Sequence, residues 1–365
     1  MWTIWFALLS GLLQSLPAQG ARLISNRLVF QNPDSTWMAP AINLALMAAV
    51  WLVVAVIASR FGRAVVTRLT TGSMLFLVLI GPLAMVPGLH IYSACLLAAG
   101  LATAGSRMIA DRPRLFDTLV RRTLPWSLAL TIGLALYVDE PSWFSQQLRG
   151  DSAQTQQRRP NVILLVLDTV RARDLSLFGY ERKTTPRLDS WARSGVVFEH
   201  AISPSPYTLP AHAAFFTGRY PHELSTDWLV ALDDQYPTLA ETLGREGYAT
   251  GGFVANLIYG SRYTGLARGF QHYTDFPLSF DSMIESSWLA RTFTNSVRHS
   301  VMDDTTPLVQ KRASEVNAEF LEWVASVQGQ PFFAFLNYFD VHAPYLPPSP
   351  QRGMFSAVPT RRPGA

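Results

Sequence analysis

Asn161-Val-Ile-Leu-Leu-Val-Leu-Asp168 is a run of six apolar residues that ends abruptly on a carboxylate. A second apolar run, residues 332–338, is followed in the same way by Asp340 and His342. Continuous apolar runs of this length are typical of strands that are buried on both faces of a parallel sheet. Ligands of open α/β sheets bind outside the carboxyl ends of the strands, so we expect Asp168, Asp340 and His342 to face one crevice.

The chain between these two runs alternates helix and strand signals. Helices are predicted at 186–194, 237–246 and 307–328, because proline-started or periodic apolar segments end there near a glycine or a new apolar run. Strands are predicted at 196–202 and 248–255. This alternation predicts an α/β domain with a mainly parallel sheet that is flanked by helices.

Thr208 stands directly before another informative segment, Leu-Pro-Ala-His212, which Thr217 and Gly218 close. Proline in the first turn and glycine after the last predict a short helix. Threonine is an ordinary N-cap for such a helix. The same position also suits a nucleophile, because a helix N-terminus attracts sulfate or phosphate and a hydroxyl beside a divalent cation loses its proton more easily. The two interpretations are compatible.

Together, the segments 161–171, 207–218 and 337–345 resemble the sulfatase family of the alkaline-phosphatase-like superfamily. The resemblance covers roughly residues 159–348. It implies an alkaline-phosphatase-like α/β fold, a bound divalent metal (Ca, Mg, Mn or Zn) and a sulfate- or phosphate-ester substrate. It also implies Thr208, His342 and His212 as catalytic candidates, with Asp168 and Thr208 as metal ligands.

The nucleophile position departs from the family pattern. Sulfatases oxidise a cysteine or serine at this point to formylglycine, but oxidation of a threonine gives a ketone. The single cysteine, Cys95, lies far away in an apolar segment. Thr208 therefore looks more like the threonine nucleophile of the membrane-bound phosphoethanolamine and phosphoglycerol transferases of the same superfamily.

Other departures weaken the implied metal site. The family has two adjacent acids where this chain has Asp168 and Thr169, and it has arginine where this chain has His212. Neither Lys183 nor Lys311 matches the catalytic lysine of the family. Family members also continue to a Ser-Asp-His-Gly segment that completes the metal site. We therefore expect a C-terminally truncated, incomplete domain that binds its metal weakly, if at all.

The first part of the chain predicts membrane helices. Five windows carry almost no charge: 2–16, 39–58, 73–86, 91–109 and 124–138. The first window is short enough for a signal-type segment, but Gln14 and the absence of an N-terminal positive cluster weigh against that reading. We expect a membrane domain of about five transmembrane helices at 1–145, a polar linker at 146–160, a partial sulfatase domain at 161–348 and a disordered tail at 349–365.

Arginine clusters predict the orientation in the membrane. Residues 60–72 and 107–122 are rich in arginine, which indicates cytoplasmic loops. An odd number of crossings then places residues 150–365 outside an inner, cytoplasmic membrane. The net charge of +4 comes from these loops and does not predict nucleic-acid binding. A single cysteine excludes a disulfide framework within the chain.

Three functional hypotheses follow. The resemblance of the whole segment favours a membrane-bound hydrolase of sulfate esters. The chemistry of threonine favours a phosphate-ester transferase that uses Thr208, for example one that moves a lipid head group to an envelope glycan. The missing metal ligands favour a degenerate, non-catalytic membrane protein.

Overall fold

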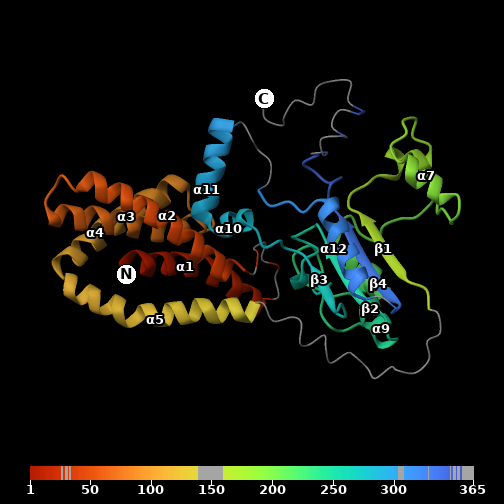
Figure 1. Cartoon of the computed structure of the whole chain (residues 1–365), viewed down its shortest axis with the longest axis horizontal. Coiled ribbons are helices and arrows are strands. Elements are labelled where there is room, and N and C mark those ends of the chain that lie inside the picture. Colours follow the sequence, from red (N-terminus) through yellow and green to blue (C-terminus); the bar gives the residue numbers. More distant parts are fainter. Residues whose placement is uncertain are drawn as a thin grey trace. The chain divides into compact units, whose positions relative to one another are not determined.

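The structure is a computed structural model that describes residues 1–25, 28, 32, 34–138, 159–302, 308–327, 329–345, 347, 351 and 354–355. The chain divides into two compact units (Figure 1). A helical unit contains residues 1–141 and 278–309, and an α/β unit contains residues 142–277 and 310–365. Most of the predicted linker, 146–160, and of the predicted tail, 349–365, lies outside the described residues.

The helical unit begins with five long helices: α1 (Trp2–Ser25), α2 (Ser35–Ala58), α3 (Arg63–Ala84), α4 (Ile91–Asp111) and α5 (Pro113–Val138). Three segments are long and apolar enough to cross a membrane, namely Ser35–Ala58, Ala64–Ala84 and Ile91–Asp111. Large apolar side chains such as Leu52, Val56 and Leu96 stay exposed on these helices. The predicted helical region with apolar spans is confirmed, while the number of five crossings stays a prediction.

Two further helices belong to the same unit although they lie far along the chain. They are α10 (Phe280–Ser286) and α11 (Trp288–Val297), followed by a short π-helical turn at Arg298–Met302. Leu289 of α11 joins the apolar core that Phe6, Met47 and Val78 form. The boundaries expected from the sequence include this segment in the α/β domain, whereas the structure groups residues 278–309 with the helices.

The α/β unit contains a four-stranded sheet in the order β1-β4-β2-β3. Its strands are β1 (Val162–Leu167), β2 (Ala249–Val254), β3 (His272–Thr274) and β4 (Phe332–Tyr338). All three pairings are parallel, with Val162 opposite Phe333 and Ala249 opposite Phe332. The predicted parallel-sheet α/β fold is therefore confirmed.

Helices cover both faces of the two central strands. Helix α12 (Ala313–Ser326) places Val316 and Trp323 against one face, where they contact Phe253 and Phe332. Helix α8 (Thr208–Thr217) packs on the other face, where Phe216 contacts Phe335. Successive residues of a strand point to opposite faces. Asn337 thus lies on the same face of β4 as Phe333 and Phe335, which is the face that α8 covers.

The remaining short helices lie in the connections of the α/β unit. They are η1 (Ala172–Asp174), η2 (Ser176–Phe178), α7 (Pro186–Ala192), η3 (Pro221–Glu223), α9 (Leu239–Arg245) and η4 (Arg262–Thr264). Helices α7 and α9 agree with the predicted helices at 186–194 and 237–246. The predicted strand at 248–255 is β2.

Three local expectations were wrong. Strand β1 is fully buried on neither face: it lies at the edge of the sheet, Ile163 and Leu165 are each 51% exposed, and the alternate residues are partly buried. The segment 196–202 forms no strand, and Val196 is 81% exposed. Helix α12 begins at Ala313 rather than at residue 307, because Glu315 caps the backbone N–H of Arg312 at 2.8 Å.

Candidate functional site

The site lies where β1, β2 and α8 meet. Asp168 directly follows β1, Asn256 follows β2 by two residues, and Thr208 begins α8. The side-chain amide of Asn256 donates to Asp168 Oδ2 at 2.9 Å and to Thr208 Oγ1 at 3.4 Å. Because one nitrogen makes both contacts, the carboxylate of Asp168 and the hydroxyl of Thr208 are neighbours. The structure thus brings together the predicted metal ligand and the predicted nucleophile.

The orientation of the Asn256 side chain is fixed by its backbone contacts. Asn256 Oδ1 accepts a hydrogen bond from the backbone N–H of Tyr259 at 3.1 Å. The amide N–H₂ group must therefore face Asp168 and Thr208, since a backbone N–H cannot be an acceptor. The backbone N–H of Asn256 donates to Asn337 Oδ1 at 2.9 Å, which links the ends of β2 and β4.

His212 lies in α8, about one turn after Thr208. Its Nδ1 lies 2.7 Å from the backbone oxygen of Thr208, so Nδ1 carries the proton and donates. Its Nε2 is buried and has no hydrogen-bond partner among the described residues. Burial lowers the pKa of His212, and the hydrogen bond to Thr208 and the charge of Asp168 oppose this only in part. The ring is thus neutral and contacts Phe335. It does not supply the positive charge that an arginine at this position would supply.

Buried polar groups gather on this face of the sheet. Asp168, Asn256, His212 and Asn337 are all almost fully buried. Asn337 Nδ2 is a second buried nitrogen that has no partner within the described residues. A buried donor without a partner is costly. The side-chain amide of Asn337 therefore has N–H groups that no described residue accepts.

Thr169 has an unusual backbone conformation. Its φ angle is +64°, which is the left-handed region that β-branched residues avoid. Its hydroxyl lies 3.5 Å from the backbone oxygen of Val341, so it connects the loops that follow β1 and β4. Strain of this kind is frequent at functional sites.

His342 and Asp340 make other contacts. The ring of His342 stacks on Phe339 with centroids 4.1 Å apart, and its Nδ1 lies 2.7 Å from the backbone oxygen of Ala343. Asp340 accepts from the backbone N–H of Ala313 at 2.8 Å, so it caps α12 on the other face of the sheet. Among the described residues, no hydrogen bond joins either side chain to the Asp168 group, and the role of His342 stays a prediction.

The described residues do not by themselves fit a divalent cation. No group of three or more His, Cys, Asp or Glu within the described ranges is placed to hold a metal ion. Hard cations prefer six or more oxygens, with several carboxylates among them. Asp168 offers one carboxylate, Thr208 offers a hydroxyl, and Asn256 presents N–H rather than oxygen to this space.

Asn256 was missed by the sequence reasoning, although its signal was present. It is the first strongly polar residue after the apolar end of β2, just as Asp168 is after β1. Polar residues at the carboxyl ends of adjacent parallel strands meet at one edge. The same rule that identified Asp168 therefore identifies Asn256.

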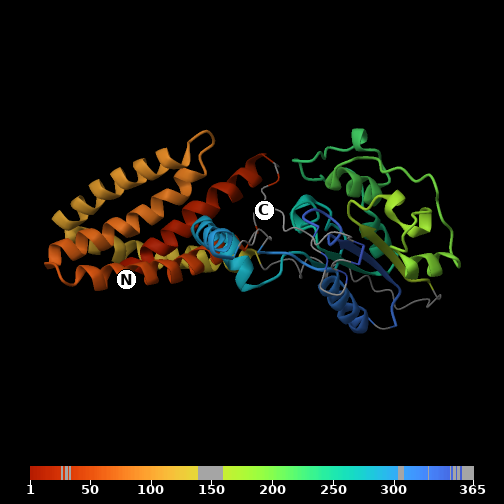
Figure 2. The same cartoon turned by 90° about the horizontal axis from the view of Figure 1, so that it is seen from above.

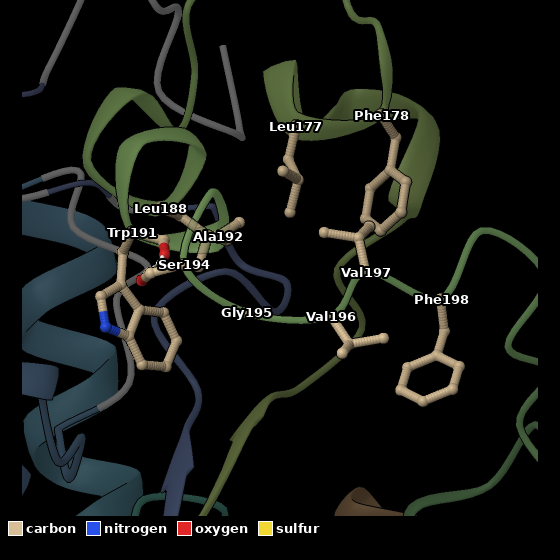
Figure 3. A pocket seen from close by; sticks show the side chains of 10 residues that line it. All are labelled: Leu177, Phe178, Leu188, Trp191, Ala192, Ser194, Gly195, Val196, Val197 and Phe198. Carbon is tan, nitrogen blue, oxygen red and sulfur yellow. Dashed lines mark hydrogen bonds between the residues drawn. The ribbon is translucent and has the colours of Figure 1, made fainter.

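An apolar pocket of about 550 Å³ lies elsewhere in the α/β unit. Figure 3 shows Leu177 and Phe178 of η2, Trp191 of α7 and Val196–Phe198 around it. Neither Asp168 nor Thr208 lines this pocket. Its lining carries no titratable side chain, so the pocket offers no chemistry of its own.

Comparisons with known proteins identify sequences and folds that are similar to this chain. A family model described as Sulfatase matches residues 160–361. N-acetylgalactosamine-6-O-sulfatase from Bacteroides thetaiotaomicron is 31% identical over 113 residues, which cover 29% of this chain and 22% of that protein. Arylsulfatase from Hemicentrotus pulcherrimus is 25% identical over 232 residues, which cover 57% of this chain and 42% of that protein.

Likeness to solved structures is weaker. Phosphonate monoester hydrolase of Agrobacterium radiobacter matches 54% of this chain and 44% of its own, with 24% identity and a TM-score of 0.41. In each of these three comparisons the chain spans less than half the length of the protein that it matches.

Proposed function

The chain belongs to the sulfatase family, and from this premise we propose that it is a membrane-bound enzyme that cleaves an anionic ester with Thr208 as its nucleophile. The observation that carries this proposal is the Asn256 amide, which holds Asp168 and Thr208 side by side. Thr208 is also the first residue of α8. A helix N-terminus favours an anionic group, so a sulfate or phosphate would lie next to the hydroxyl.

Phosphate-ester transfer is the reaction that suits this nucleophile best. Thr208 Oγ1 forms a bond to phosphorus while the bond to the leaving alcohol breaks. The hydroxyl proton passes to Asp168, whose carboxylate accepts from the same amide nitrogen of Asn256, and the leaving oxygen takes up a proton from solvent. A hydroxyl of the acceptor, on an envelope glycan or a lipid, then bonds to phosphorus as the bond to Thr208 Oγ1 breaks. Asp168 returns its proton to Thr208, and the proton of the acceptor passes to solvent. Asn256 acts as a positioning residue that keeps both oxygens in place.

Sulfate-ester hydrolysis is the second candidate, and membership of the family favours it. The relatives N-acetylgalactosamine-6-O-sulfatase and arylsulfatase are named for this reaction. Thr208 counts against it, because a threonine cannot form the aldehyde that the family resemblance implies. The third candidate is a non-catalytic protein, which the single carboxylate of the site favours.

The proposal also includes a bound divalent cation and a position in the inner membrane. A divalent cation, whether Ca, Mg, Mn or Zn, would bind weakly here, because the described residues offer it one carboxylate. Asp168 and Thr208 are the described residues that would contact it. We place α1 to α5 across the inner membrane: α2, α3 and α4 are long and apolar enough by themselves, and the arginine-rich residues 60–72 and 107–122 lie on the cytoplasmic side. Residues 150–365 then face the extracytoplasmic side, where lipid and glycan substrates are found.

The test compares the two ester classes on the full chain in nanodiscs, with each of the four cations. We expect negligible turnover of 4-nitrophenyl sulfate, because Thr208 cannot form the aldehyde that the family resemblance implies for sulfate esters. With a phospholipid head-group donor, we expect mass spectrometry to detect a covalent adduct on Thr208. Thr208→Ala removes the adduct, and Thr217→Ala at the other end of α8 keeps it. Arylsulfatase turnover that persists in Thr208→Ala would overturn the proposal.

A further inference from the structure

Hydrogen bonds fix the α10–α11 segment against the first two helices. Ser287, between α10 and α11, donates its hydroxyl to Asn43 Oδ1 of α2. The backbone N–H of Trp288 donates to Gln14 Oε1 of α1 at 2.9 Å. Asn43 and Gln14 both donate to the hydroxyl of Ser10 on α1, at 3.2 and 3.0 Å. These buried polar groups satisfy one another, so they specify where the segment docks.

The docking point has a definite depth along α2. Asn43 lies eight positions after Ser35, the first residue of α2. At 1.5 Å per residue, the contact lies about 12 Å from that end of the helix. Gln14 also lies against Gly81, in the last turn of α3, so the end of α3 is at the same level. The α10–α11 segment therefore docks about a third of the way along α2 from its first residue, on the side of the bundle where α3 ends.

Helix α11 runs across the bundle rather than along it. Figure 1 shows α11 upright beside the horizontal helices α2, α3 and α4. Figure 2, turned by 90° about the horizontal axis, shows α11 nearly end-on while the same helices run obliquely along the view. A helix that crosses membrane-spanning helices in this way lies in the plane of the membrane.

An apolar stripe of α11 continues beyond the part that the bundle covers. Leu289 and Ala290 are buried in the first turn. Phe293 and Val297 follow at intervals of four and eight residues from Leu289, so they lie on the same face. Phe293 is 62% exposed and Val297 is 38% exposed. The stripe thus starts as a protein contact and ends as an exposed apolar surface.

The opposite face of α11 carries positive charge. Arg291 and Arg298 are seven residues apart and therefore share a face of the helix, away from the stripe. Arg291 lies 4.0 Å from Glu285 of α10, an ion pair that is partly exposed to solvent. An amphipathic helix with arginine on one face and phenylalanine on the other suits the boundary between lipid head groups and acyl chains.

We propose that α11 is an interfacial membrane helix, which inserts Phe293 and Val297 among the acyl chains of a phospholipid bilayer and points Arg291 toward the head groups. This inference rests on the proposed insertion of α2, α3 and α4. Its occupant is the bilayer, because the stripe is continuous with the core contact of Leu289 and lies on the side of the bundle where α3 ends. The chain leaves the α/β unit at Leu278 and returns after Val309. Residues 278–309 are therefore a membrane-bound segment, and the chain of the α/β unit continues on both sides of it.

The test uses single cysteines in a Cys95→Ser background, labelled with an environment-sensitive fluorophore in phospholipid nanodiscs. We expect nitroxide-labelled lipids to quench the probe of Phe293→Cys about twofold more than that of Arg291→Cys, because the two positions lie on opposite faces of one interfacial helix. Aqueous iodide should give the reverse order. Val297→Cys provides a second position on the stripe.

Leu52→Cys, on the exposed surface of α2, separates the two levels of the proposal. Lipid quenching at Leu52 without quenching at Phe293 and Val297 would overturn the interfacial helix alone. Absence of lipid quenching at all three positions would overturn the membrane insertion as well. Phe293 and Val297 contribute exposed surface, so their replacement leaves the core contacts of the helical unit in place.

Discussion

The side-chain amide of Asn256 donates to the carboxylate of Asp168, 88 residues earlier in the chain, across 2.9 Å and thereby joins the ends of β1 and β2. Both groups are buried. A buried carboxylate that accepts no hydrogen bond destabilises the folded state. This hydrogen bond therefore stabilises the folded α/β unit, apart from any part that it plays in a reaction.

Replacement of Asn256 should destabilise the α/β unit. We expect Asn256→Leu to lower the free energy of unfolding by about 1–3 kcal/mol, because Asp168 loses a buried donor. Asn317→Leu is the control, since it removes one hydrogen bond to the neutral hydroxyl of Tyr338 at an exposed position. Denaturant unfolding in detergent measures both. Equal losses in the two variants would show that the Asn256–Asp168 contact contributes little.

Stability should fall in mildly acidic solution because of His212. Burial lowers its pKa in the folded chain below the usual histidine value of 6.5. The unfolded state therefore binds more protons below that value, and the contribution of His212 is present above pH 6.5 and lost as the pH falls below it. The slope is at most about 1.4 kcal/mol per pH unit for one proton.

Unfolding measured between pH 7.5 and 5.5 should thus show a smaller loss in His212→Gln than in the unchanged chain. His222→Gln, at an exposed position, provides the comparison. His272 is a second histidine whose pKa is lowered by burial, so part of the acid sensitivity remains in both variants. An identical pH dependence in His212→Gln and in the unchanged chain would contradict the assigned neutral state.

The backbone of Thr169 stores strain that a substitution can release. A β-branched residue in the left-handed region costs about 1–2 kcal/mol, and asparagine tolerates this region better. We expect Thr169→Asn to raise the free energy of unfolding by about 1 kcal/mol. A thermal melt shows the change as a higher Tm. Destabilisation would mean that the Thr169 contact with Val341 outweighs the strain.

An added carboxylate should improve cation binding at the same position. With one described carboxylate, we expect the unchanged chain to bind Ca²⁺ or Mg²⁺ with a Kd above about 1 mM. Thr169→Asp places a second acid next to Asp168 and should tighten binding by roughly tenfold. Thr169→Asn has a similar shape and backbone preference without the charge. Isothermal titration distinguishes the three chains, and micromolar binding by the unchanged chain would refute the expectation.

Cysteine labelling from either side tests the predicted orientation. In a Cys95→Ser background, Ser203→Cys in the α/β unit should react with an impermeant maleimide added outside intact cells. Ser59→Cys, at the exposed end of α2, should react only after the membrane is opened. The reverse pattern would place residues 60–72 and 107–122 outside.

The sequence was sufficient where apolar runs are continuous. Strands β1 and β4 begin and end where their apolar runs do, and the two residues Asp168 and Thr208 lie together as expected. The sequence did not predict how exposed a strand is, because this exposure depends on the elements that lie beside it in the fold. The exposure of β1 follows from its edge position, and an apolar run alone does not distinguish an edge strand from a central one.

The α10–α11 segment illustrates a second limit. Its residues form ordinary amphipathic helices, and no local pattern distinguishes a helix that covers a sheet from one that docks on distant helices. The partners of Ser287 and Trp288 are Asn43 and Gln14, more than two hundred residues earlier in the chain. Such pairing is set by tertiary structure, so it becomes visible only when the fold is known.

Among the residues that the structure describes, β1 pairs with β4 on one side and with no strand on the other, and this edge has a consequence for the behaviour of the chain in solution. Ile163 and Leu165 remain half exposed beside this edge. An uncovered strand edge with apolar side chains is a template for a strand from another molecule. We therefore expect self-association that grows with protein concentration and that detergent suppresses poorly, since main-chain hydrogen bonds rather than apolar contacts alone would hold the copies together.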